Sequence, residues 1–166
     1  KEIRRVARMT RTMLEISMQA LLTLDTRGLT RVYKTEEAVD ILKEGVNIYL
    51  HQIAERELSE RQSILLQYLG SCMNDFERAA DHIDTFGQLT DQKIKKDIWF
   101  DNDDVKQLVI LYKSIDEILK LTVRSLKPLS DKTDVSLEAL VAVQDQYFEK
   151  SKAVREIFQQ KILNKG

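Results

Sequence analysis

Glycine and proline are scarce in this chain, with five Gly and one Pro among 166 residues. Average proteins carry about 12% of the two residues together. β-Sandwiches, barrels and loop-rich folds place such residues in turns about every 8 to 12 positions, so the shortage argues against those folds. Apolar residues instead recur at spacings of three and four, which is typical of amphipathic helices. The sequence therefore predicts an all-α fold of long helices.

The composition also limits the class of function. Basic and acidic side chains nearly balance, at 26 and 27, whereas a general nucleic-acid binder has a net basic surface, so we expect no nucleic-acid partner. The single cysteine, Cys72, cannot form an internal disulfide. No stretch approaches the roughly 18 uncharged apolar residues of a membrane span. The chain begins with Lys1 rather than Met, so we expect a fragment of a longer protein.

The apolar periodicity predicts five helices, which short connections should pack as a long antiparallel bundle. Their apolar faces include Leu24, Leu65 and Tyr68. The predicted helices cover residues of about 2–25, 30–57, 60–90, 104–127 and 135–163.

Breaks and caps mark the ends of these helices. Gly28 lies in the first break, and Pro128 ends the fourth helix. Ser59 and Gln62 form a capping-box pattern that opens the third helix, and Asn102 or Asp103 is expected to cap the fourth. The aromatic residues Trp99 and Phe100 lie in the expected connector and should be buried.

An internal repeat is visible in the apolar pattern. A shift of 102 positions superposes the first predicted helix on the fourth, and a shift of 109 superposes the second on the fifth. We therefore expect one domain over residues 1–166, with the equivalent of the third helix lying beyond Gly166. Its parts are a first repeat of about 1–90, a connector of 91–103 and a partial second repeat of about 104–166.

Three of the predicted helices carry two acids four residues apart, which places both on one helix face. The first acid of each pair has no Lys or Arg three or four positions away. An unpartnered half-buried carboxylate is costly, so an Arg from another helix, a shared proton or a metal ion must compensate it. Facing carboxylates suit hard cations such as Mg, Ca, Mn and iron. The pairs are Glu36 and Asp40, Glu77 and Asp81, and Asp145 and Glu149.

A basic stripe occupies the start of the first helix. Cations there oppose the helix dipole, so either the helix begins upstream or the stripe faces anionic lipid, as basic residues beside a cytoplasmic membrane exit do. An ordinary solvated basic face is the third interpretation. The stripe consists of Lys1, Arg4, Arg5, Arg8 and Arg11.

No catalytic constellation is visible. His51 and His82 are the only histidines, and neither follows a Glu by three, as the ligands of di-iron oxidases do. No Ser-His-Asp or Cys-His set can be assembled from so few candidates. We therefore expect no enzyme, although a carboxylate–metal hydrolase stays as a rival class.

The segment DFERAADHIDTF at 75–86 resembles the D-L-E-R-I-G-D-H-A-x-N-I motif of PhoU-like proteins, which are phosphate regulators built from two three-helix repeats. Ala80 stands where the family has Gly, and Thr85 stands where Asn is usual. The matching positions are Asp75, Glu77, Arg78, Asp81 and His82.

The resemblance extends to the other acidic pairs. Glu36 and Asp40 match the E/D-x-x-x-D motif of the family, and Asp145 with Glu149 is a looser match with the acids swapped. The resemblance implies a metal-cluster face and leaves the metal open among Fe, Mn, Mg, Zn and Ca. Its implied ligands are Glu36, Asp40, Glu77 and Asp81, with Asp145 and Glu149 as weaker candidates.

The resemblance also implies a non-catalytic regulator of phosphate uptake that acts through protein contact. A similar domain is fused behind the membrane part of bacterial sodium/phosphate cotransporters, and the basic stripe favours that version. We then expect a cytoplasmic domain attached to the inner membrane, with the transmembrane transporter domain of the same polypeptide as its partner and a homodimer as its assembly. The alternatives are a stand-alone PhoU-type phosphate-signalling regulator and a metal-free helical interaction module.

Overall fold

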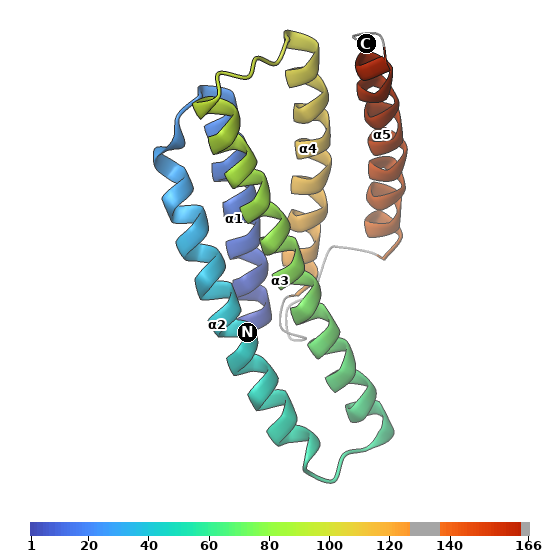
Figure 1. Ribbon diagram of the computed structural model, residues 1–166. Coiled ribbons are helices and arrows are strands. Elements are labelled where there is room, and N and C mark those ends of the chain that lie inside the picture. The colour runs from blue at the N-terminus through green and yellow to red at the C-terminus, as the bar shows by residue number, and fades with distance from the viewer. Residues whose placement is uncertain (127–136, 164–166) are drawn as a thin grey trace. The chain divides into compact units, whose positions relative to one another are not determined.

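The computed structural model describes residues 1–126 and 137–163, and these residues form five α-helices and no strand, so the all-α prediction is confirmed (Figure 1). A 3₁₀ turn, η1, at Thr26–Gly28 separates the first two helices, as the position of Gly28 predicted. Pro128 lies outside the described residues. The helices are α1 (Glu2–Thr23), α2 (Leu29–Ala54), α3 (Glu60–Lys95), α4 (Asn102–Ser125) and α5 (Leu137–Leu163).

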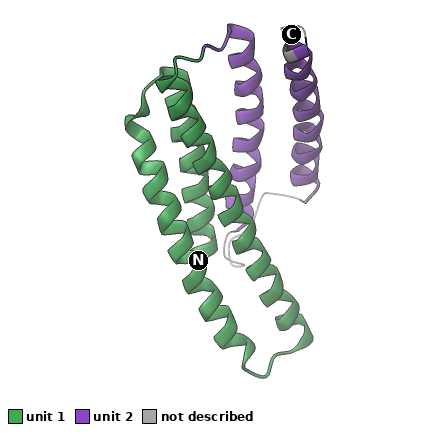
Figure 2. Ribbon diagram, viewed as in Figure 1, with its two compact units in different colours: residues 1–98 green, residues 99–166 purple. Residues whose placement is uncertain are grey.

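The chain divides into two compact units, unit 1 at Lys1–Ile98 and unit 2 at Trp99–Gly166 (Figure 2). In unit 1, α1, α2 and α3 alternate in direction and each packs against the other two. In unit 2, α4 packs against α5. The expected single domain and its repeat boundaries stay a prediction.

Local capping signals set where two helices begin. The Ser59 hydroxyl accepts the Gln62 backbone N–H, and the Gln62 side chain accepts the Ser59 N–H, so the predicted capping box opens α3. The expected cap of α4 was wrong. Asp101 caps this helix, because its extended backbone, with φ −72° and ψ 169°, directs its carboxylate at the N–H groups of Asp103 and Asp104.

Unit 1 has a continuous apolar interior. The core-facing sides of its three helices converge there, which is how a helix bundle buries the stripe of each helix. Its buried apolar residues are Val6, Ala7, Met13, Leu14, Met18, Ala20, Leu21, Leu29, Val32, Val39, Met73, Phe76, Ala80 and Ile83.

Two residues expected on the apolar face of α3 are exposed instead, Leu65 at 57% and Tyr68 at 69%. The reason is the difference in helix length. The 22 residues of α1 span about 33 Å and the 36 residues of α3 about 54 Å at 1.5 Å per residue. α1 therefore cannot cover the whole of α3, and the early turns of α3 lack it as a neighbour.

Three further expectations were wrong near the helix ends. Leu24 is 51% exposed, because it closes α1 in a left-handed conformation with φ 55°. Trp99 is 78% exposed in the segment between α3 and α4. α3 continues to Lys95, beyond the expected end near residue 90, and the backbone turns only at Asp97, with φ 51°.

Candidate metal centre

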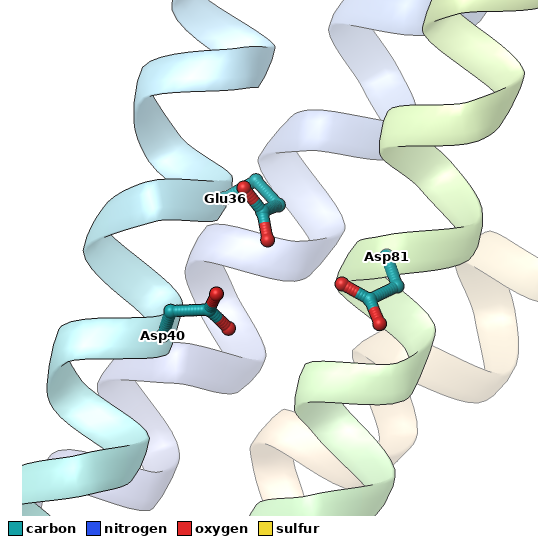
Figure 3. Close-up of side chains that lie close together, drawn as sticks. All are labelled: Glu36, Asp40 and Asp81. Atoms are coloured by element: carbon teal, nitrogen blue, oxygen red, sulfur yellow. The ribbon is translucent and has the colours of Figure 1, made fainter.

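The antiparallel packing of α2 on α3 brings two acidic faces together. Glu36 and Asp40 lie one turn apart on α2, and Asp81 projects from α3 toward them (Figure 3). One carboxylate oxygen from each of the three residues lies within 4.8 Å of the others. Asp40 and Asp81 are exposed, whereas Glu36 is partly buried. The three acids, here called the carboxylate triad, form an acidic cluster beside the unit 1 core.

Without a cation, the carboxylates of the triad repel one another. Burial raises the pKa of Glu36 from its ordinary 4.5 to about 7, and repulsion from Asp40, Asp84 and Asp81 acts in the same direction. When protonated, Glu36 donates a hydrogen bond to Asp81, which raises this pKa further. A proton on Glu36 therefore reduces the repulsion among the three carboxylates in the metal-free protein.

The donor set also fits a hard metal ion. All three donors are carboxylate oxygens, the ligand type that Mg²⁺, Ca²⁺ and Mn²⁺ prefer. Two ligands on opposite sides of a Ca²⁺ ion lie about 4.8 Å apart, at roughly 2.4 Å per bond. The oxygens of the triad lie within this distance of one another, so small side-chain rotations would bring all three into contact with one ion.

Glu77, the fourth predicted ligand, has a different partner. Its carboxylate lies 2.7 Å from the ammonium of Lys43, and the two side chains are only 15% and 31% exposed. The hydrogen bond to Glu77 raises the pKa of Lys43, and the nearby carboxylates of Asp40 and Asp81 add to this effect. Lys43 stands three residues after Asp40 on α2, but its ion pair is with Glu77 on α3.

A pocket of about 430 Å³ adjoins the triad at Glu36. The other acids that line this pocket were not predicted from the sequence. The spacing could have indicated Asp84, because it follows Glu77 by seven residues and so shares the same face of α3. Lys95 pairs with Asp91 at 2.6 Å beside it, and burial together with Asp91 and Asp84 raises the pKa of Tyr33. The pocket is lined by Tyr33, Glu36, Glu37, Asp84, Gln88, Asp91 and Gln92.

The weaker pair does not form a comparable group. Asp145 and Glu149 are exposed on α5. Among the described residues, no set of three potential metal ligands includes either of them.

The basic stripe lies along the first turns of α1. Lys1, Arg5 and Arg8 are exposed, whereas Arg4 and Arg11 are partly buried. Arg5 lies 3.6 Å from the carboxylate of Glu2, and both side chains are well exposed, so this ion pair contributes little. Nothing in the described helices is long and apolar enough to cross a bilayer.

Comparisons with known proteins place the acidic face in a family context. The profile of the PhoU domain matches residues 3–90, which is more than half of the chain and includes α1, α2 and the acidic turns of α3. No curated protein and no solved structure matches the chain.

Proposed function

We propose, from the premise that this chain belongs to the PhoU domain family, that it is a non-catalytic regulatory domain of a phosphate uptake system. The proposal includes a metal ion held by the acids of α2 and α3. The observation that carries the metal site is the carboxylate triad, in which Glu36, Asp40 and Asp81 present oxygens within 4.8 Å of one another from two helices.

A bound metal ion would neutralise these acids and cross-link α2 to α3. Glu36, Asp40 and Asp81 would hold it directly, while Glu77 stays with Lys43. The chain's own residues then transmit the state of the site, because α2 and α3 both continue beyond it to the exposed end of the helical hairpin. That end carries apolar side chains suited to protein contact, including Ile48, Tyr49 and Tyr68.

The metal proposal is tested by elemental analysis of protein purified without chelator. We expect bound metal in the wild type and loss of at least about tenfold in metal affinity in Glu36→Gln/Asp81→Asn. The matched control is Asp145→Asn/Glu149→Gln, which removes an exposed acid pair outside the triad and should keep the metal. A metal-free wild type that also shows no stabilisation by added Mn²⁺ or Fe would overturn the metal site.

The transporter context is the finer part of the proposal. We infer that the domain is the cytoplasmic part of a sodium-dependent phosphate cotransporter and lies at the inner membrane, with the transmembrane domain of the same polypeptide as partner and with a homodimer as its assembly. The exposed cations Lys1, Arg5 and Arg8 on one face of α1 support contact with anionic headgroups.

Co-sedimentation with vesicles tests this membrane contact. The protein should bind vesicles with about one-third anionic lipid more strongly than vesicles of phosphatidylcholine alone, and binding should weaken with salt. Arg5→Gln/Arg8→Gln should reduce binding, whereas Arg31→Gln on α2 is a control that also lowers positive charge. Equal binding to both vesicle types would contradict the membrane contact and favour a stand-alone regulator.

A metal-free helical interaction module is the second candidate. It is favoured by two features that compensate acids without any ion, the Lys43–Glu77 pair and the raised pKa of Glu36, which lets this acid hold a proton near neutral pH. The elemental analysis separates the two candidates, because only the metal-binding domain retains metal through purification. A phosphatase assay with Mn²⁺ or Mg²⁺ tests the rival hydrolase class.

A further inference from the structure

The Lys43–Glu77 pair crosses the interface beside the carboxylate triad. The ammonium lies 2.7 Å from the Glu77 carboxylate, and neither side chain is more than 31% exposed. A contact of this kind is stronger than a surface ion pair, because solvent screens it less and a half-buried charge without a partner is costly. Lys43 is therefore a fixed part of this interface.

The helix register makes Lys43 part of the acidic face. On α2, Glu36, Asp40 and Lys43 follow one another at helical spacings of four and three, and on α3, Glu77 precedes Asp81 by one turn. Antiparallel packing then sets Lys43 opposite Glu77 while Asp40 lies near Asp81. Four carboxylates share this face, and one of them already has a cation that the protein supplies itself.

We propose that Lys43 determines how many metal ions the acidic face binds and how tightly it binds them. It holds Glu77 out of the donor set and places a positive charge next to the triad, which limits the face to one metal ion bound by three carboxylates. This inference rests on the metal site proposed above and names the residue that sets its affinity and donor number.

Two physical effects of Lys43 act in the same direction. A positive charge near the triad repels a divalent cation, and the repulsion is twice that for a monovalent ion at the same distance. The ion pair also occupies the oxygens of Glu77, which would otherwise add a hard donor within one turn of Asp81. Removing the ammonium therefore strengthens cation binding, whereas removing Glu77 as well restores the net charge of the wild-type face.

The test is titration calorimetry with Mn²⁺ on the full chain after treatment with chelator, with thermal unfolding as a second measurement. We expect Lys43→Met to bind Mn²⁺ at least about tenfold more tightly than the wild type. The double variant Lys43→Met/Glu77→Gln should return to within a few fold of the wild-type affinity. Lys34→Met is the matched control, since Lys34 is an exposed lysine of α2 that lies two positions before Glu36 and does not share its face.

Thermal unfolding keeps the test informative if Lys43→Met is destabilised. Glu77 then lacks its partner, so the metal-free variant should unfold at a lower temperature, and Mn²⁺ should raise its Tm by more than it raises that of the wild type. Equal Mn²⁺ affinity and equal Tm shifts in the wild type, Lys43→Met and Lys34→Met would overturn the role of Lys43. The proposed metal site would then stand unchanged.

The remaining outcomes separate this inference from the proposed metal site. Binding by Lys43→Met but not by the wild type would support the role of Lys43 and overturn the metal site of the natural chain. Absence of Mn²⁺ binding in every variant would overturn both.

Discussion

Fourteen apolar side chains are buried in unit 1, whereas Leu119 and Val154 are the only apolar side chains buried among the described residues of unit 2. Both units consist of amphipathic helices of 22 residues or more. Unit 1 arranges three of them around a shared interior, but unit 2 pairs two, and two helices share only one strip of surface. The comparison shows that the third helix, rather than the amphipathic pattern itself, creates the interior.

The acidic pairs follow the same division. Glu36 and Asp40 on α2 meet Asp81 on α3, so three carboxylates converge. Asp145 and Glu149 have the same spacing on α5 but remain exposed and belong to no such group among the described residues. An i, i+4 acid pair thus becomes a candidate ligand set only where a facing helix adds another acid.

The largest expected effect is the loss of stability when a buried leucine is truncated in each unit. Leu14→Ala in unit 1 and Leu119→Ala in unit 2 remove the same side chain from sites that are 6% and 8% exposed. We expect Leu14→Ala to lower the free energy of unfolding by about 2–5 kcal/mol, and Leu119→Ala to cost less, since fewer buried groups surround the cavity it leaves. Urea unfolding of both variants measures this difference. Equal costs would break the comparison of the two units.

The next effect is the pH dependence that Glu36 gives to unit 1. Its pKa is raised from 4.5 to about 7 in the folded protein, so between these pH values the folded state holds a proton that the unfolded chain has lost. This stabilisation is present near pH 4.5 and is lost as the pH rises through 7. In the presence of chelator, we expect the free energy of unfolding to fall by on the order of 1 kcal/mol from pH 5 to pH 7.5.

Glu36→Gln is the variant that tests this assignment, because glutamine keeps the size of the side chain but cannot ionise. Its stability should lose the decline between pH 5 and pH 7.5 and should exceed that of the wild type at the upper end. A decline of the same size in Glu36→Gln would assign the pH dependence to another group.

The smallest expected effect is a second pH dependence of stability, which arises in unit 2 and has the opposite sign to that of Glu36. Lys161 on α5 lies 2.8 Å from Asp101 and 2.7 Å from Asp104, the two carboxylates of the α4 capping box. Hydrogen bonding from Lys161 and the backbone N–H groups lowers the pKa of Asp101 to about 2. The stabilisation is therefore present above pH 3.8 and is lost as the pH falls toward 2.

Lys161→Met removes this link between α5 and the start of α4. We expect the pKa of Asp101, followed by carbon-detected NMR, to rise toward its ordinary value, and amide exchange in α5 to become faster with little change in unit 1. The backbone caps of Asp101 remain, so the pKa should stay somewhat below normal. An unchanged Asp101 pKa would show that the caps alone account for its value.

Short-range signals made much of the fold predictable. The apolar periodicity identified all five described helices, and Ser59 with Gln62 located the start of α3, because capping and periodicity depend on residues within one or two turns. The cap at Asp101 was missed, since several acids in a row fit the same local pattern and only the backbone conformation distinguishes them.

The sequence by itself therefore determined that this chain is helical, where most of its helices lie, and which acids share a helix face. The tertiary structure alone decided that Asp81 joins Glu36 and Asp40, that Glu77 binds Lys43, and that Tyr68 is left exposed. The physical reason is that contacts between helices depend on their relative register and lengths. Those are set by the packing of the whole unit and not by the spacing of residues along one helix.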